Sequence, residues 1–259
     1  MISEDQIVKP IKKEVVQKFI SIHYPSLNEE SIQYKGGGSF SVFSVGENYI
    51  FRFSKDWLED LDELKANFEY EKNILNEIRK FVRPHKLPEH QKLIIDKDIY
   101  SGGVWVTRKF HGDLLKKLIN KENKTEIAKL LGNFLGKLHS IDINLLISLK
   151  FENQSNEEIR KNWFKNYEDN KNNNFFYLFS EEKKYFEKVY DEFLSIAHDM
   201  KPIKCLVHGD FGPLNCLIGN NNNYLQIIDC EDIGYGHAVS DFCTWYGHYG
   251  EEFLDDMLS

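Results

Sequence analysis

The sequence contains few cysteines and no long apolar run. Its four cysteines in 259 residues, Cys205, Cys216, Cys230 and Cys243, match neither a zinc-site spacing nor a redox pair. No uninterrupted apolar stretch is long enough for a transmembrane helix, and residues 1–19 are too polar for a signal peptide. We therefore expect a cytoplasmic protein with reduced thiols, no structural metal and no membrane partner.

Basic residues are fewer than acidic residues in this sequence. Lys and Arg number 33 against 41 Asp and Glu, so the formal net charge is −8. A net acidic chain is a poor candidate for binding nucleic acid. Hydrophobic residues make up 41% and aromatic residues 14%, which excludes a disordered, collagen-like or coiled-coil chain. The length fits one large domain or two lobes.

The excess of negative charge lies in the second half of the chain. Residues 151–259 carry 20 acidic and 9 basic side chains, whereas residues 1–150 carry 21 acidic and 24 basic ones. A solvated acidic surface is the ordinary explanation. The alternative is a first half that handles anionic groups and a second half that faces a cationic molecule.

Residues 32–53 predict β-strands separated by short turns, because β-branched and aromatic residues are frequent there. The first turn reads Gly36-Gly37-Gly38-Ser39. Successive glycines let backbone N–H groups approach an anion closely, and this anion is usually a phosphate. Alone, three glycines more often form a plain flexible turn, and the pattern matches neither of the common nucleotide-binding glycine motifs.

A helix is predicted after these strands by one apolar stripe, Leu61, Leu64, Phe68, Leu75, Ile78 and Val82. Glu71 falls on this stripe, and a buried carboxylate is costly unless it is paired. Arg52, between Phe51 and Phe53, offers a cation on the preceding strand. Either residue alone fits a solvated position. Together they suggest an internal ion pair near the glycine turn, as in the nucleotide site of protein kinases.

The second half contains a spacing typical of phosphoryl transfer. Asp210 follows an apolar strand-like run, Asn215 comes five positions later, and Asp229 ends the next predicted strand. Asp210 can accept a proton from an attacking hydroxyl, and Asn215 and Asp229 can supply hard oxygen ligands to Mg²⁺. His208, just before the catalytic loop, is expected to be a structural hydrogen-bonding residue.

The tripeptide His111-Gly112-Asp113 repeats the start of this motif without its continuation. We expect it to form the turn that leads into the second lobe. A helix follows, with a core stripe made by Ile127, Leu131, Phe134 and Leu138, and His139 at its end is expected to be structural.

The segment 208–215 and the run Ile227-Ile228-Asp229-Cys230-Glu231 resemble the aminoglycoside phosphotransferase/choline kinase family, closer to its antibiotic-kinase branch. The resemblance extends over residues 49–53, Glu71, Leu138-His139 and Asp241-Phe242. It implies an α+β bilobal, protein-kinase-like fold, with an N-terminal antiparallel sheet plus one helix and a larger, mainly helical C-terminal lobe. The expected lobes are 1–107 and 113–259, joined by a connector at 108–112.

The resemblance also implies the parts of the site. Asp210 would be the catalytic base, and Asn215 and Asp229 would bind Mg²⁺. The co-substrate would be ATP or GTP, with its ring against the connector from Thr107 to Phe110 and its phosphates near the glycine turn. Arg52 would contact phosphate while paired to Glu71, and Asp241 would hold the catalytic loop.

Some positions depart from the family pattern. Arg52 stands where relatives usually have Lys, and Gly236-His237-Ala238 replaces a common Gly-Asp-Pro. Cys230 stands where an aromatic residue is common, and relatives usually continue beyond the position of Ser259 with further helices. The last of these departures bears on the acceptor rather than on phosphoryl transfer, because the further helices of relatives help to close the substrate site.

Three functions remain open. A small-molecule kinase is favoured, and a protein kinase is disfavoured because only residues 230–240 separate Asp229 from Asp241. A nucleotide-binding pseudokinase or scaffold usually lacks the base or a metal ligand, and all three are present here. We expect a monomer or a weak dimer.

The acceptor is the least determined part. Glu231 and Asp232 follow the metal loop and would suit a cationic, aminoglycoside-like acceptor, with support from Glu157, Glu158, Glu251, Glu252, Asp255 and Asp256. A choline-type kinase would instead use an aromatic cage, for which Trp163, Tyr167, Trp245, Tyr246 and Tyr249 are candidates. Sugar, nucleoside and macrolide hydroxyls stay possible acceptors.

Overall fold

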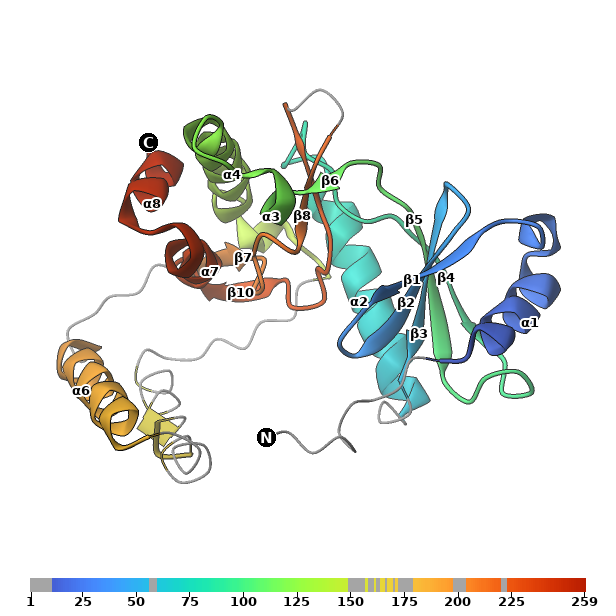
Figure 1. Ribbon diagram of the computed structural model, residues 1–259, viewed down its shortest axis with the longest axis horizontal. Helices are drawn as coiled ribbons and strands as arrows, with labels where there is room; N and C mark the ends of the chain where they lie inside the picture. The colour runs from blue at the N-terminus through green and yellow to red at the C-terminus, as the bar shows by residue number, and fades with distance from the viewer. Residues whose placement is uncertain are drawn as a thin grey trace.

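The computed structural model describes residues 11–55, 60–148, 157, 161, 164–165, 167–169, 171, 179–197, 204–219 and 223–259. An N-terminal sheet with helices on both faces lies beside a mainly helical C-terminal part (Figure 1). This arrangement confirms the predicted α+β fold with an N-terminal antiparallel sheet and a larger, mainly helical second part.

The N-terminal sheet of the described residues has five antiparallel strands in the order β1-β2-β3-β5-β4. Strands β1 (Ile32–Gly36), β2 (Phe40–Val45) and β3 (Tyr49–Ser54) occupy the predicted strand region. Strand β5 (Gly103–Arg108) also lies where strand-like residues occur. Strand β4 (His90–Ile95) was not predicted.

Two helices cover the two faces of this sheet (Figure 1). The predicted helix is α2 (Leu61–Ile78), and it begins where the side chain of Asp60 accepts two backbone N–H groups of its first turn. The other helix, α1 (Lys13–His23), was not predicted, although its buried residues follow the i, i+3, i+4 pattern of a core-facing stripe. The lobe therefore has one helix more than expected.

Side chains along β3 alternate between these two faces. Phe51 and Phe53 are fully buried in the core shared with α1, as the period of two requires. Arg52, between them, lies on the α2 face, where Phe40 and Trp105 pack together with residues of α2. The alternation of the strand therefore places the cation under α2.

The C-terminal part is mainly helical. Its helices are α3 (Leu115–Leu118), α4 (Lys124–His139), α6 (Ser180–Ala197), α7 (Ser240–Tyr249) and α8 (Glu251–Leu258). Its short strands are β6 (Asp113–Leu114), β7 (Lys204–Val207), β8 (Cys216–Ile218), β9 (Leu225–Ile227) and β10 (Gly234–His237). Strands β6, β8 and β9 form one antiparallel sheet, and β7 pairs with β10. Two 3-10 turns, Pro25–Leu27 and Ile143–Leu145, complete the described elements.

Helix α2 contributes to two separate cores. Leu64 and Phe68 in its first half pack with Trp105 against the N-terminal sheet. Leu75 and Ile78 in its second half belong to the large core of the C-terminal part. This large core contains the predicted α4 stripe, and Trp245 of α7 is also fully buried in it. The two parts of the molecule are therefore joined by packing as well as by the chain.

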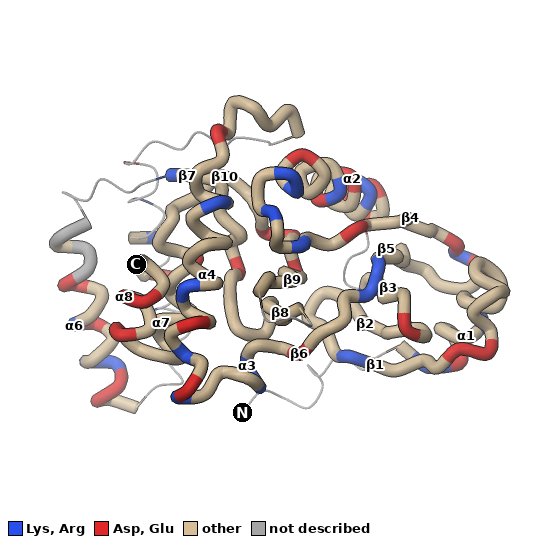
Figure 2. Tube along the Cα trace, turned by 90° about the horizontal axis from the view of Figure 1, so that it is seen from above, with Lys and Arg blue, Asp and Glu red and all other residues tan. Residues whose placement is uncertain are grey.

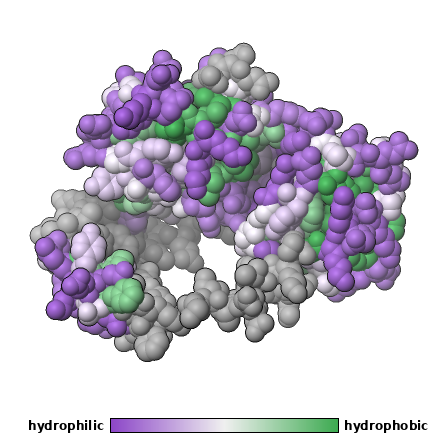
Figure 3. All heavy atoms as spheres, viewed as in Figure 1, coloured by the Kyte–Doolittle hydropathy of each residue, from purple (hydrophilic) through white to green (hydrophobic). Residues whose placement is uncertain are grey.

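The surface matches this distribution of side chains. Figure 3 shows hydrophilic residues over much of the described face, with hydrophobic areas exposed on both the N-terminal and the C-terminal part. Within the described residues, every helix is too short or too polar to cross a membrane.

Candidate active site

Asp210 and Asn215 lie on the loop between β7 and β8. The side-chain amide of Asn215 donates to Oδ2 of Asp210 at 2.8 Å and to the Asp210 carbonyl at 2.9 Å. The amide nitrogen is thus used inside the loop, which leaves the Oδ1 atom of Asn215 to face a cation. Asp210 itself is exposed, so that a substrate hydroxyl can reach its carboxylate.

Asp229 follows β9 in a left-handed backbone conformation, with φ of 60°. This conformation costs a non-glycine residue about 1–3 kcal/mol, and residues of this kind gather at functional sites. The N–H of Ile228 donates to the carbonyl of Asn215 at 2.9 Å. The two predicted metal ligands, Asn215 and Asp229, therefore lie on segments that are hydrogen-bonded to each other.

The buried carboxylate of Asp241 holds the start of the catalytic loop. It accepts the backbone N–H groups of His208 and Gly209, each at 2.9 Å. Nε2 of His139 lies 2.9 Å from the same carboxylate. Gly209 has φ of 88°, and a Cβ atom there would lie 2.6 Å from the carbonyl oxygen of Asp232, so the loop needs glycine at this position.

His208 is buried within this loop rather than exposed to a substrate. Its Nδ1 accepts the backbone N–H of Asp210 at 3.3 Å, and its Nε2 lies 3.7 Å from the sulfur of Cys230. Burial lowers the pKa of His208 below its usual value, against the opposing charge of Asp241. The enclosed imidazole therefore orients the loop through its contacts with Asp210 and Cys230.

The guanidinium of Arg52 lies against a pair of aromatic rings that contact each other, with centroids 5.0 Å apart. Its Cζ atom is 4.5 Å from the ring centroid of Phe40 and 5.2 Å from that of Trp105. Trp105 is the residue paired with Arg52 across β3 and β5, so the sheet register itself brings the ring to the cation. A planar guanidinium stacks on aromatic faces in a way that an ammonium does not.

Arg52 also reaches from the N-terminal sheet to the C-terminal part. Its Nη2 lies 3.3 Å from Oδ1 of Asp229 and 3.2 Å from Oε2 of Glu231. The side chain of Arg52 is only 12% exposed, so these contacts are partly shielded from water. The predicted phosphate-binding cation is therefore in direct contact with the predicted metal loop.

The predicted ion pair between Arg52 and Glu71 is replaced by other pairings. Nε2 of His90 lies 2.8 Å from Oε1 of Glu71, although the two atoms do not form a hydrogen bond in the structure. Burial raises the pKa of Glu71, but His90 and Arg52 both lower it, and the net pKa is below the usual value. Arg52 thus acts on Glu71 through its charge, because its guanidinium is drawn to the carboxylates of the metal loop.

The glycine turn at 36–39 joins β1 and β2. Gly37 has φ of 125°, and a Cβ atom there would lie 2.2 Å from the carbonyl oxygen of Phe40, so only glycine fits. Sequence reasoning missed Lys55, whose Nζ donates to the Gly37 carbonyl at 3.1 Å. The N–H of Lys55 also donates to the carbonyl of Ser39 at 3.1 Å. This largely buried lysine holds the turn from the end of β3.

The residues predicted to contact the nucleotide ring, Thr107 to Phe110, begin inside the N-terminal sheet. Thr107 is buried, and its hydroxyl lies 3.1 Å from Nδ1 of His90. Phe110, beyond the end of β5, is half-buried. The hydroxyl of Thr107 has a partner within the protein, which leaves Phe110 and the connector backbone to meet a nucleotide ring.

Glu231 and Asp232 come after Asp229 and Cys230 and are both exposed. Burial and the neighbouring charge of Asp229 raise the pKa of Glu231, against the opposing charge of Arg52. Burial, Asp210 and Asp229 raise the pKa of Asp232. The two predicted acceptor residues therefore share one region of negative charge with the catalytic loop.

The other residues considered for the acceptor are more dispersed. Figure 2 shows acidic residues along α8, where Glu252 lies 3.6 Å from Lys124 and Asp256 accepts the hydroxyl of Thr125 on α4. Of the aromatic cage candidates, Trp245 is fully buried and Tyr167 is stacked on Tyr190, while Tyr246 is exposed. Trp163 and Glu158 lie outside the described residues.

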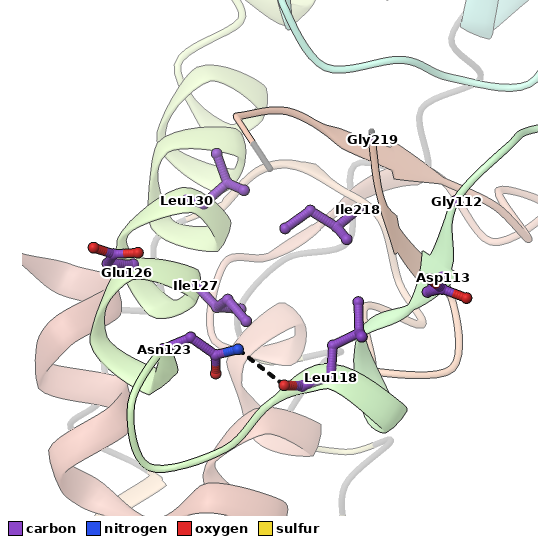
Figure 4. Close-up of a pocket in the computed structure, with 9 residues that line it drawn as sticks. All are labelled: Gly112, Asp113, Leu118, Asn123, Glu126, Ile127, Leu130, Ile218 and Gly219. Carbon is purple, nitrogen blue, oxygen red and sulfur yellow. Dashed lines mark hydrogen bonds between the residues drawn. The ribbon is translucent and has the colours of Figure 1, made fainter. Parts of the chain in front are cut away.

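A cavity of about 390 Å³ lies beside the repeated tripeptide and away from these loops (Figure 4). Asp113 starts β6 and pairs with Ile218, so the tripeptide forms the turn into the second part, as predicted. The cavity is lined by Gly112, Asp113, Leu118, Asn123, Glu126, Ile127, Leu130, Ile218 and Gly219. None of the predicted catalytic or metal residues is among them.

The donor set at the two loops suits Mg²⁺. The described residues contain no group of three or more His, Cys, Asp or Glu side chains that could enclose a metal ion. Mg²⁺ usually takes only one or two protein oxygens and completes its octahedron with water and substrate phosphates. Oδ1 of Asn215 and the carboxylate of Asp229 are such oxygens.

Comparison with known proteins decides the family. The model of the phosphotransferase enzyme family matches residues 31–258, which is most of the chain and includes both loops. This protein belongs to the phosphotransferase enzyme family. Asp210, Asn215 and Asp229 thus stand in a member of a family of phosphoryl-transfer enzymes, and the chain is a phosphotransferase.

Solved structures share the fold of this phosphotransferase. The GDP complex of aminoglycoside 2′-phosphotransferase-IIIa is 19% identical, with a TM-score of 0.77 over 95% of this chain and 82% of that one. The streptomycin–ATP complex of APH(2″)-IIa is 20% identical, with a TM-score of 0.63 over 96% and 84%. The macrolide 2′-phosphotransferase MphH from Brachybacterium faecium is 15% identical, with a TM-score of 0.70 over 95% and 81%. No curated protein matches the chain by sequence.

Proposed function

We propose that this phosphotransferase moves the γ-phosphoryl group of ATP or GTP to a hydroxyl of a small cationic molecule and requires Mg²⁺. The observation that carries the proposal is the contact of Arg52 with the Asp229 loop, at 3.3 Å. Arg52 lies close to the glycine turn, and this contact brings it together with the predicted metal loop. Transfer of a phosphoryl group from a bound nucleotide to an acceptor requires these two parts to lie close to each other.

Each residue has a chemical task in this proposal. Asp210 accepts the proton of the attacking hydroxyl, and the amide of Asn215, at 2.8 Å, fixes the orientation of its carboxylate. Asn215 and Asp229 would hold Mg²⁺, which neutralises charge on the transferred phosphoryl group. Arg52 contributes a further positive charge from the N-terminal side.

The nucleotide would lie between the two parts of the chain. In this proposal residues 1–107 hold its phosphates, residues 108–112 form the connector, and residues 113–259 carry the catalytic loops and the acceptor. The glycine turn supplies backbone N–H groups, and Phe110 supplies an apolar surface for the ring. The enzyme would act as a monomer or a weak dimer.

A cationic acceptor is supported by the charge around the catalytic loop. Burial raises the pKa of Asp232, and the neighbouring charges of Asp210 and Asp229 raise it further. Glu231 adds a further acid that faces Arg52. An acceptor with ammonium groups would relieve this repulsion, so an aminoglycoside-like molecule fits the site better than a neutral sugar or macrolide.

A choline-type acceptor has less support. Trp245, one of the candidates for an aromatic cage, is fully buried in the core beside Phe211 and Phe253. It cannot also face a quaternary ammonium group without leaving that core.

The direct test is nucleoside-diphosphate release with ATP and with GTP against aminoglycosides, choline, common sugars and macrolides. Turnover with an aminoglycoside is expected. The variant D210N should lower kcat by about 100-fold or more, because general-base catalysis contributes about 10²–10⁴-fold. The matched control is D113N in the repeated tripeptide, which should keep activity within about twofold.

The outcomes separate the enzyme from the acceptor. If only choline or a sugar is phosphorylated, the assignment of an aminoglycoside-like acceptor is wrong, whereas the assignment as a small-molecule kinase is still supported. Equal inactivity of wild type, D210N and D113N across the panel would contradict the proposed reaction.

A further inference from the structure

Helix α2 is hydrogen-bonded to the segment that follows Asp229. Tyr70, near the middle of α2, donates its hydroxyl hydrogen to the carbonyl oxygen of Ile233 at 3.0 Å. The two residues are 163 positions apart in the sequence, and Figure 1 shows α2 between the N-terminal sheet and the C-terminal part. This hydrogen bond therefore joins the N-terminal helix directly to the segment that carries a predicted metal ligand.

Ile233 ends a tight turn that begins directly after Asp229. The N–H of Ile233 donates to the carbonyl of Cys230 at 3.2 Å, which closes the turn 230–233. Both end residues of this turn are buried in the large C-terminal core. Because the turn is closed by a hydrogen bond and anchored by two buried side chains, a contact that holds Ile233 also helps to place Asp229.

The same turn lies against the catalytic loop. A Cβ atom at Gly209 would lie 2.6 Å from the carbonyl oxygen of Asp232, so the two residues are in close contact. Directly after the turn, Gly234 on β10 pairs with Val207 on β7, the strand that leads into the catalytic loop. The turn 230–233 therefore lies between the catalytic loop and α2.

The surroundings of Tyr70 keep its hydroxyl a donor. Its ring is half-buried and packs against the large C-terminal core. Burial raises the pKa of Tyr70 above its usual value, so the phenol is protonated at neutral pH. Phenylalanine at this position would keep the ring and remove the group that holds Ile233.

We propose that Tyr70 is a positioning residue for the metal site: by holding the carbonyl of Ile233 from α2, it fixes the turn that sets the place of Asp229 beside the catalytic loop. The inference rests on the proposed function, because it assumes that Asp229 holds Mg²⁺. Tyr70 acts through the backbone of the turn. Its effect should therefore appear in binding of the Mg²⁺–triphosphate complex and not in binding of the nucleoside ring.

The variant Y70F tests this role in binding experiments that need no knowledge of the acceptor. Calorimetric titration measures affinity for a non-hydrolysable triphosphate analogue with Mg²⁺, for the same analogue in EDTA, and for the parent nucleoside. We expect Y70F to weaken binding of the Mg²⁺ complex by about fivefold, as for loss of one hydrogen bond. Affinity for the analogue in EDTA and for the nucleoside should change by less than about twofold.

A matched control for loss of a tyrosine hydroxyl is Y24F. Tyr24 is half-buried as well, but its ring packs on Phe51, on the α1 face of the N-terminal sheet. This variant should stay within about twofold of wild type in every titration.

A double variant tests whether Tyr70 acts through the metal ligand. D229N removes the predicted carboxylate ligand, so the place of this residue no longer matters for metal binding. Y70F combined with D229N should therefore bind the Mg²⁺ complex as D229N alone does, within about twofold.

Hydrogen–deuterium exchange gives a readout without nucleotide or metal. The amides of residues 230–234 should exchange about fivefold faster in Y70F than in wild type, because the turn has lost its contact with α2. The amides of α4, which lies in the same core, should exchange at an unchanged rate.

Several results would overturn the inference. It fails if Y70F binds the Mg²⁺ complex as wild type does, if Y70F loses nucleoside affinity equally, or if Y24F loses as much as Y70F. A further loss in the D229N background, or unchanged exchange at residues 230–234, would also contradict it. Triphosphate binding by wild type that does not depend on Mg²⁺ would instead overturn the proposed function, and this inference with it.

Discussion

Nη2 of Arg52 lies 3.3 Å from Oδ1 of Asp229, so the central strand of the N-terminal sheet contacts the loop after β9 directly. The same guanidinium lies against the rings of Phe40 and Trp105. An ammonium at this position would keep the charge and lose the contact of a planar cation with these aromatic faces.

R52K should therefore not be conservative in this chain. We expect about a tenfold lower kcat/KM for the nucleotide, since cation–π contacts are worth about 0.5–2 kcal/mol each. Steady-state kinetics with varied nucleotide provides the measurement. The matched control is R83K, because Arg83 is exposed and lies outside the predicted nucleotide site. Similar losses in both variants would show that the stacking of Arg52 has no special importance.

D241N should destabilise the fold. One carboxylate oxygen becomes an amide that cannot accept the N–H of His208 or Gly209, and no water can replace it because Asp241 is fully buried. We expect a loss of about 2–4 kcal/mol in the free energy of unfolding, measured by urea denaturation. D255N, at an exposed position of α8, should stay within about 0.5 kcal/mol of wild type. Comparable stability of the two variants would contradict the idea that Asp241 holds the catalytic loop.

The four thiols should differ sharply in reactivity. Burial raises the pKa of Cys205 to about 11, and it raises the pKa of Cys216 and Cys230 well above the usual value. The thiolate is the reactive form, so only the exposed Cys243 should react quickly with a disulfide reagent at pH 8. A colorimetric thiol count should give one fast group in the native protein and four after denaturation. Persistence of the fast phase in C243S would show that a buried thiol is accessible.

D232N should stabilise the protein near neutral pH. Burial and the charges of Asp210 and Asp229 raise the pKa of Asp232 in the folded state, so ionisation of this group opposes folding. The difference in melting temperature should shrink as the pH falls through the folded pKa and should vanish below the ordinary value of 3.8, where both states are protonated. Differential scanning calorimetry across this range gives the measurement.

The same variant should lose affinity for a cationic acceptor, because it removes one of the acids beside Asp210. D98N, at an exposed turn between β4 and β5, is the control for both effects. A melting temperature of D232N that is lower than that of wild type at pH 7 would contradict the argument from charge repulsion.

Local patterns carried the sequence interpretation furthest. Asp210, Asn215 and Asp229 lie on two short strands and their loops, so their spacing can be recognised without knowing how distant elements pack. Strands β1 to β3 and helices α2 and α4 were likewise predictable, because their apolar periods are clear over the whole element.

Pairings that depend on sheet register were not predictable. His90 reaches Glu71 only because β4 lies at one edge of the sheet and shifts its register at that point. Trp105 reaches Arg52 because β5 lies beside β3, although β4 comes between them in the sequence. The predicted pair of Arg52 and Glu71 was wrong for this reason: the choice among three nearby carboxylates depends on how the two parts of the chain meet.

Helix α2 belongs to two cores at once, through Leu64 and Phe68 at one end and Leu75 and Ile78 at the other. An N-terminal fragment that ended at residues 108–112 would leave Leu75 and Ile78 exposed to water. A C-terminal fragment that began there would lack these two residues of its hydrophobic core. The two lobes should therefore melt in one transition, and any opening of the nucleotide site must pivot about the carboxyl end of this helix, which stays anchored in the C-terminal core.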